Sequence, residues 1–255
     1  MRFFGGAPRQ RVLWNGTEEE LADFRRLRRN GAQAKRRAIA RAERLVGACH
    51  ENPDGEQDAV RAIGDASLLL DSGERPHLVV PLLKAAPRSV FWRGLLQVWS
   101  SFDATWAITD LLDECFDEHG YGIDFLEREA KDFLDALPDP LMLYRGCQSG
   151  RERGIAWTTD RTVADKFAHG TRWSIPDGRI ATITVPKLQV VAVITDRGES
   201  EVLLRSRMLP QNFNCEIPGQ VSPTRPQRGH QPLPSGRVDL CPRSGSHHRA
   251  DQERR

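Results

Sequence analysis

Two glutamates separated by one residue are the first candidates for chemistry in this sequence. Glu199 and Glu201 lie at the start of a short stretch that becomes apolar and ends at Leu204. Residues two apart in a strand point to the same face, so the two carboxylates would project together, roughly 7 Å apart. One could stabilise an oxocarbenium-like cation as a glycosidic bond breaks, and the other could orient or deprotonate the incoming nucleophile. The alternative is a pair of solvent-facing charges beside a turn at Gly198, and the pair taken alone favours that alternative.

An arginine, a glycine and two threonines could complete such a site. Arg145 and Gly146 follow the apolar run 141–144, and Thr158 and Thr159 lie in a later strand-like stretch. A guanidinium can form two parallel hydrogen bonds to a phosphate or a carboxylate, and a glycine lets a ligand approach the backbone closely. A surface arginine at a strand end and ordinary strand threonines are the alternative explanations.

The order of these blocks is more informative than any block alone. A Tyr-Arg-Gly block (144–146) precedes a Trp-Thr-Thr-Asp block (157–160), and a Glu-Ser-Glu-Val-Leu-Leu block (199–204) follows them. Over about residues 138–210 this order resembles the Arg–Ser–Glu branch of the mono-ADP-ribosyltransferases, which includes arginine-modifying bacterial toxins and their relatives. It also resembles uncharacterised bacterial and phage-encoded proteins that share the first two blocks.

The resemblance implies that the chain uses NAD as a substrate and binds it with matching residues. Arg145 would hold the NAD phosphates, and Gly146 would lend backbone contacts on the nicotinamide side. Thr158, with Thr159 beside it, stands where the family has a Ser-Thr-Ser block, from which this sequence departs. The family fold is a split pair of small β-sheets that enclose NAD, with helices on one side.

The resemblance also implies the catalytic roles. Glu201 would grip the nicotinamide ribose and stabilise the cation, and Glu199 would assist transfer to the acceptor, which we expect to be a protein arginine. An aromatic residue should stack on the nicotinamide, and Trp173 is the first candidate and Phe167 the second. Two alternatives remain open: an NAD glycohydrolase with water as the acceptor, and a non-enzymatic protein that binds RNA or another partner.

Motifs for other chemistries are missing from the sequence. It has no Gly-x-Gly-x-x-Gly after a strand, no Gly-Lys-Ser/Thr phosphate loop, no His-Glu-x-x-His and no nucleophile elbow. Its five cysteines are far apart without a Cys-x-x-Cys pair, so we expect neither a metal nor a disulfide framework. This cysteine pattern fits a reducing cytoplasm best, so we expect a cytoplasmic protein. No secretory signal is recognisable, and the apolar runs are too short to span a bilayer, so we expect no membrane partner.

The sequence pattern changes at Pro138-Asp139-Pro140, and this change predicts the fold class. The preceding region favours helices, and the following region contains short strand-like runs. We therefore expect an α+β protein, with a helical N-terminal half followed by a small split β-sheet core like that of ADP-ribosyltransferases. The expected parts are a basic helical N-terminal segment (1–50), a helical region that packs on the core (51–137), the β-rich core (138–218) and a disordered tail (219–255).

Local signals predict particular elements. Thr17 with Glu20 is typical of a capping box, and Gly31 should weaken or break the helix that begins there. Pro81 interrupts an apolar run, and Asp160 is well placed to cap a helix over 161–168. Three of the six tryptophans lie close together, which indicates a helical core. Strands are expected over residues 141–145, 155–159, 179–185, 190–195 and 200–204.

Charge is unevenly distributed along the chain. The net charge is only +2, but basic residues crowd the stretch 25–44 while residues 110–139 are acidic. Basic helices can bind phosphates. However, aromatic residues do not alternate with these charges and no known nucleic-acid motif is present. A solvated helix face is therefore the favoured interpretation, and RNA or an acidic partner is the minority one.

Overall fold

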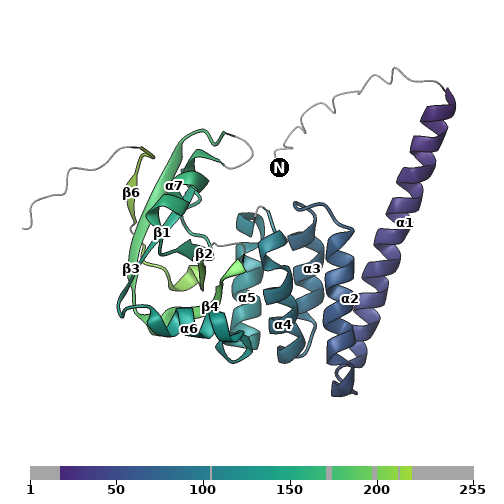
Figure 1. The fold of residues 1–255 in the computed structure, drawn as a ribbon, viewed down its shortest axis with the longest axis horizontal. Helices are drawn as coiled ribbons and strands as arrows, with labels where there is room; N and C mark the ends of the chain where they lie inside the picture. The colour runs from purple at the N-terminus through teal and green to yellow at the C-terminus, as the bar shows by residue number, and fades with distance from the viewer. Residues whose placement is uncertain (1–17, 104, 171–173, 197–199, 212, 220–255) are drawn as a thin grey trace, which may run out of the picture. The chain divides into compact units, whose positions relative to one another are not determined.

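The structure is a computed structural model that describes residues 18–103, 105–170, 174–196, 200–211 and 213–219, and these form one compact unit (Figure 1). Helices fill the first part and a six-stranded antiparallel sheet fills the second, which confirms the α+β class. The capping residue expected at Thr17 and the tail beyond residue 219 lie outside the described residues. None of the described helices is both long and apolar enough to cross a membrane.

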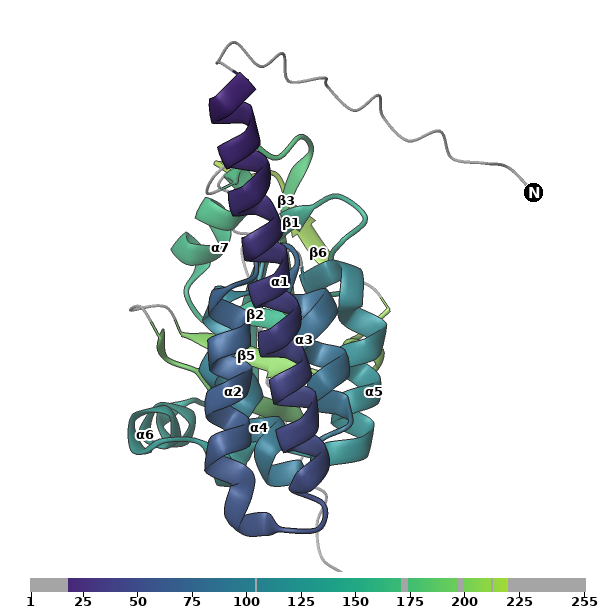
Figure 2. The ribbon, with the colours of Figure 1, turned by 90° about the vertical axis from the view of Figure 1, so that its right-hand side faces the viewer.

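Five helices of the first part pack side by side, with α1 along α2 (Figures 1 and 2). A sixth helix precedes the sheet, and a seventh lies between its second and third strands. The α-helices are α1 (Glu18–Ala48), α2 (Glu56–Leu68), α3 (Arg75–Lys84), α4 (Arg88–Val98), α5 (Thr109–His119), α6 (Arg128–Ala136) and α7 (Arg161–His169). Short 3-10 turns are η1 (Pro53–Gly55), η2 (Trp99–Ser101), η3 (Thr105–Ile108), η4 (Ile123–Phe125), η5 (Lys187–Gln189) and η7 (Ser206–Met208).

The helix break considered at Gly31 does not occur. Helix α1 continues through Gly31, because one glycine costs only about 1 kcal/mol in a helix interior and its neighbours are strong helix formers. Pro81, which interrupts the apolar run in the sequence, lies inside α3. Val80 and Leu83 on either side are fully buried, so tertiary packing outweighs the lost backbone hydrogen bond.

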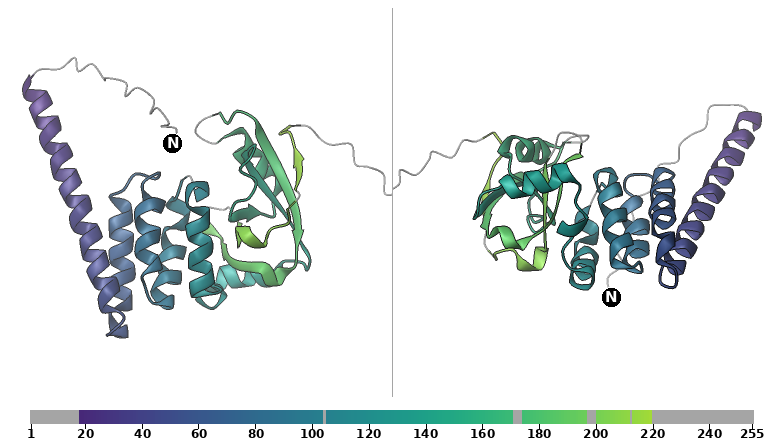
Figure 3. Two further views of the ribbon diagram at one scale, coloured as in Figure 1. Left: turned by 180° about the vertical axis from the view of Figure 1, so that it is seen from behind. Right: turned by 60° about the horizontal axis from the view of Figure 1, so that its bottom comes forward.

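The sheet has the strand order β4-β5-β2-β1-β3-β6. Figure 3 shows the sheet and the helices from two further sides. Strands β1 and β3 pair along their whole length, whereas β1 and β2 pair only at Tyr144 and Thr158. The sheet therefore consists of two groups of strands that meet at a narrow seam. The strands are β1 (Leu141–Gln148), β2 (Ala156–Thr158), β3 (Gly178–Val185), β4 (Val190–Ile194), β5 (Glu201–Leu204) and β6 (Asn214–Glu216).

Five strands agree with the sequence prediction, and the sixth was missed. All residues of β4 are buried, as expected for a strand covered on both faces. Strand β6 has the sequence Asn-Cys-Glu and lies at the edge of the sheet beside β3, where two of its three residues are exposed. A short polar edge strand has no apolar alternation, so the sequence held no signal for it.

The helices and the sheet share one hydrophobic core. It includes Trp92 of α4, Phe116 of α5 and Trp157 of β2, all buried. Trp99 is also buried, which confirms two of the three clustered tryptophans as core residues, whereas Trp106 is 47% exposed. A smaller cluster, in which Ala164 and Ala168 of α7 pack against Ile180 and Tyr144, covers the other face of β1 and β3.

Candidate functional site

The strand register brings the predicted motifs together at the seam of the sheet. Thr158 of β2 lies directly opposite Glu201 of β5 on one side and opposite Tyr144 of β1 on the other. Residues directly opposite in an antiparallel pair face the same side of the sheet and interact. Arg145 follows Tyr144, so three blocks that are distant in the sequence occupy three neighbouring strands.

Arg145 is half-buried and bound to the first residue of β2 and to the loop that precedes it. Its Nη1 donates to the carbonyl oxygen of Ala156 at 2.7 Å, and its Nε donates to that of Arg151 at 3.5 Å. The guanidinium lies against Gly154, where a Cβ would overlap it. Gly154 therefore seats the arginine, a role that sequence reasoning missed because the contact depends on the fold.

The charge of Arg145 is coupled to its surroundings. Burial lowers the pKa of Arg145, while Cys147, Glu201 and Glu152 oppose that shift. An arginine stays protonated in proteins because its pKa starts so high. The site therefore holds a fixed positive charge that interacts with the carboxylate of Glu201.

Glu201 is the first residue of β5 and is half-buried. The indole Nε1 of Trp99 donates a hydrogen bond of 2.5 Å to its Oε2. Trp99 belongs to η2 in the helical part and is only 3% exposed. Sequence reasoning placed this tryptophan in the core without linking it to the site, since the two residues lie 102 positions apart.

Thr158 is buried, and its hydroxyl is engaged locally, because Oγ1 accepts the backbone N–H of Asp160 at 3.1 Å. Asp160 in turn caps α7, since Oδ1 accepts from the backbone nitrogen and the hydroxyl of Thr162, each at 2.7 Å. The predicted cap of α7 is thus confirmed. Thr159 is half-buried between them. Contact of either threonine with NAD remains a prediction.

Gly146 has a packing role that the sequence did not indicate. A Cβ there would overlap the carbonyl oxygen of Ala164 and lie 2.5 Å from the backbone nitrogen of Ala168, so α7 fills this space. The same helix covers Gly178 of β3, where a Cβ would overlap the carbonyl oxygen of Ala168. On this face of β1, the backbone of α7 occupies the space beside Gly146 that we expected a ligand to approach. A backbone contact from Gly146 to NAD remains a prediction.

Two predicted site residues, Glu199 and Trp173, lie outside the described residues. The paired carboxylates and the aromatic that stacks on the nicotinamide therefore remain predictions from the sequence. Of the other candidates, the structure brings Arg145, Thr158 and Glu201 to adjacent strands.

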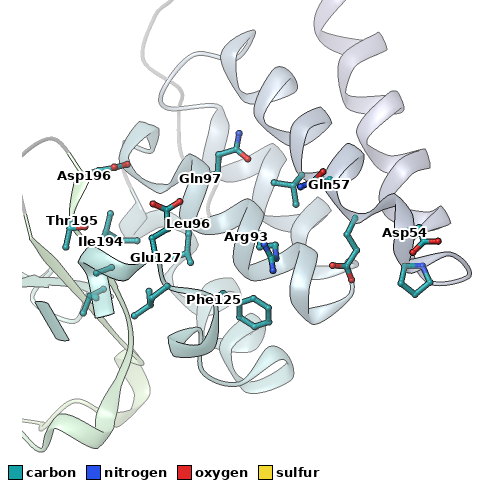
Figure 4. Close-up of a pocket in the computed structure, with 16 residues that line it drawn as sticks. Asp54, Gln57, Arg93, Leu96, Gln97, Phe125, Glu127, Ile194, Thr195 and Asp196 are labelled. Atoms are coloured by element: carbon teal, nitrogen blue, oxygen red, sulfur yellow. The ribbon is translucent and has the colours of Figure 1, made fainter. Parts of the chain in front are cut away.

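A cavity of about 780 Å³ lies between α2, α4, η4 and the end of β4 (Figure 4). Its wall holds the apolar side chains of Leu96 and Phe125, and Ile194, which pairs with Glu201 across the strands, reaches it as well. Acidic residues outnumber the one cationic residue, Arg93. The carboxylates in the wall belong to Asp54, Glu56, Glu127 and Asp196.

A second cavity, of about 560 Å³, lies beside η3 and the loop after β1. It is basic, and the guanidinium of Arg151 stacks on the ring of Trp106 at 3.7 Å. Neither cavity has Arg145, Thr158 or Glu201 in its wall. The candidate site is therefore defined by strand register rather than by either of these two cavities.

Two buried cysteines are poor nucleophiles. Burial raises the pKa of Cys115 to about 12 and that of Cys147 to about 11, so both thiols stay protonated at neutral pH. Within the part of the chain that the structure describes, no group of three or more His, Cys, Asp or Glu side chains could hold a metal ion.

No known protein family, curated protein or solved structure matches this chain. Its function must therefore be inferred from the sequence blocks and from the geometry that brings them together.

Proposed function

We propose that this chain is an NAD-dependent mono-ADP-ribosyltransferase that modifies arginine in an acceptor protein. The observation that carries the proposal is the register that aligns Tyr144, Thr158 and Glu201 on three neighbouring strands. Arg145 follows Tyr144 in β1, and its positive charge interacts with Glu201. The narrow seam between β1 and β2 also accords with the split sheet that the sequence resemblance implies.

The proposed chemistry uses charge that develops on a sugar. As the bond from ribose to nicotinamide breaks, nicotinamide leaves with the bonding electron pair, and the carboxylate of Glu201 stabilises the resulting cation. An arginine nitrogen of the acceptor then attacks the anomeric carbon, and Glu199 removes its proton. Two of the five N–H donors of Arg145 bind backbone carbonyl oxygens, so the other three can bind the NAD phosphates.

The acidic cavity supports a cationic acceptor. Its carboxylates create a negative potential that attracts a basic polypeptide segment. Glu127 and Asp196 line the same cavity as Ile194, the residue that pairs with Glu201 (Figure 4). An acceptor arginine held there would lie beside the strand that carries the catalytic carboxylate. We place the reaction in the cytoplasm, where exposed thiols such as Cys215 stay reduced.

The test is incubation of the purified protein with NAD and with matched peptides that contain either arginine or lysine. Wild-type protein should release nicotinamide and attach ADP-ribose to the arginine peptide. Glu201→Gln should lower the rate by about 10³-fold, because it removes the charge that stabilises the transition state, while the circular dichroism spectrum stays unchanged. Glu216→Gln in β6, where the carboxylate pairs with Arg161, is the matched control and should keep full activity.

Other outcomes would change the conclusion in defined ways. Nicotinamide release without labelled peptide or protein would identify an NAD glycohydrolase. A fully active Glu201→Gln variant would refute the assigned mechanism. If the folded protein released no nicotinamide, a binding protein that uses the basic helix α1 would be favoured. That function predicts salt-sensitive binding of RNA, which deletion of residues 17–48 would abolish. Part of the charge of α1 is already paired within the fold, since Lys35 contacts Glu74 at 2.7 Å.

A further inference from the structure

The turn η2 contacts both ends of the connection between β4 and β5. Its first residue, Trp99, donates to Glu201 at 2.5 Å, and Glu201 begins β5. Its second residue, Ser100, donates from Oγ to Oδ2 of Asp196 at 3.1 Å, and Asp196 lies shortly after the end of β4. One turn of the helical part therefore holds the entry and the exit of the segment that carries the Glu-Ser-Glu block.

The turn is itself held in place from α2 and α3. Arg75 donates from Nη1 to the carbonyl oxygen of Ser101 at 3.0 Å and from Nε to that of Ser67 at 2.8 Å. The hydroxyl of Ser101 donates to the carbonyl oxygen of Val98 at 2.6 Å. Trp99 is buried against Phe102, with ring centroids 6.1 Å apart. The indole therefore has little freedom to leave the carboxylate.

The bond from Trp99 to Glu201 has a defined chemical effect. An indole N–H can only donate, so its partner must be an acceptor oxygen, and the bond is strongest when the carboxylate is ionised. A rigid donor also fixes the plane of the carboxylate before the substrate arrives. Preorganised groups stabilise a transition state best because they need not reorient during the reaction.

We propose that Trp99 is a positioning residue that orients the Glu201 carboxylate for ADP-ribose transfer, with Ser100 fixing the other end of the same connection. This inference rests on the proposed function. It makes the helical half an integral part of the active site, because η2 supplies a donor to the catalytic carboxylate.

The first test reads the bond directly and needs no activity. In full-length protein labelled with ¹⁵N, the side-chain N–H signal of Trp99 should shift in the Glu201→Gln variant, because a charged acceptor is replaced by a neutral amide. Glu216→Gln should leave that signal in place. If the Trp99 signal did not shift in Glu201→Gln, the proposal would be overturned, whether or not the protein consumes NAD.

The second test separates positioning from stability. Trp99→Phe keeps an aromatic ring and removes the N–H, so kcat should fall about tenfold or more while KM for NAD changes less than about twofold. Trp92→Phe is the matched control, since it removes another buried indole bond, that of 3.2 Å to the carbonyl oxygen of His119. This control should lose stability but keep kcat.

The outcomes distinguish this inference from the function on which it rests. Active wild-type protein with an equally active Trp99→Phe variant, or with equal loss of kcat in Trp92→Phe, would overturn the role of Trp99 alone. If Glu201→Gln shifts the Trp99 signal but wild-type protein consumes no NAD, the proposed function is overturned. The role of Trp99 in ADP-ribose transfer is then overturned with it.

Discussion

At Gly146, two backbone atoms of α7 occupy the place where a side chain would begin. The carbonyl oxygen of Ala164 and the nitrogen of Ala168 belong to the helix backbone and cannot rotate away as a flexible side chain would. An added methyl group would therefore have to push α7 off β1. Strand β1 runs without a break through Gly146. The steric constraint therefore acts on this one residue and not on the course of the strand.

We predict that Gly146→Ala destabilises the protein by about 3 kcal/mol, since overpacking against backbone is relieved only by moving the helix. Urea unfolding followed by circular dichroism measures this. The matched control is Gly31→Ala in α1, where a Cβ meets nothing within 4 Å. That variant should gain up to about 1 kcal/mol from better helix propensity. Equal effects of the two substitutions would contradict the packing role of Gly146.

At the scale of elements, helix α7 is stabilised by its N-terminal cap as well as by its packing. Hydrogen bonds from the hydroxyl and backbone of Thr162 hold the pKa of the Asp160 carboxyl below its usual value. A carboxyl with a lowered folded pKa stabilises the fold at pH values above its unfolded pKa, and this contribution is lost as the pH falls through the folded pKa.

Asp160→Asn keeps a neutral capping group and removes the charge, so the variant should be less stable than wild-type protein at neutral pH. The difference should shrink and vanish as the pH falls through the lowered pKa of Asp160, because the wild-type carboxyl then becomes neutral too. Thermal unfolding of both proteins over a series of acidic buffers provides the measurement. A difference that stays constant with pH would show that the charge of the cap does not stabilise α7.

At the scale of the whole molecule, a buried carboxylate joins the helices to the connection between β5 and β6. Asp113 of α5 is fully buried and accepts three hydrogen bonds from the segment after β5. Its donors are the backbone nitrogen and hydroxyl of Ser206, at 2.8 and 2.5 Å, and the backbone nitrogen of Arg207, at 3.1 Å. This junction and η2 are two of the polar links between the helical half and the sheet.

We expect Asp113→Asn to destabilise the whole protein by about 3 kcal/mol, because an amide nitrogen would face donors inside a buried network. Asp117→Asn is the control, since its carboxylate pairs with Arg205 and Arg207 at a half-exposed position. It should cost less than about 1 kcal/mol. If Asp113→Asn melted only the sheet in a separate transition, the helices and the sheet would not form one cooperative unit.

Much of the fold could be predicted from the sequence. Helix and strand periodicities identified most elements, and Asp160 could be recognised as a cap from its position alone. Gly31 was misjudged as a possible break, since one glycine costs little in a helix interior. Strand β6 escaped notice because a polar strand at a sheet edge needs no apolar pattern.

For the candidate site, the sequence by itself determined the residue types and their order: an arginine, a threonine and a glutamate in three separate blocks. Only the tertiary structure decided that Thr158 faces Glu201, that α7 covers Gly146 and that Trp99 binds the carboxylate. Local propensity depends on neighbours within a few residues, so it leaves a trace in the sequence. Strand register and buried contacts depend on how distant segments pack, and no short stretch of sequence contains that information.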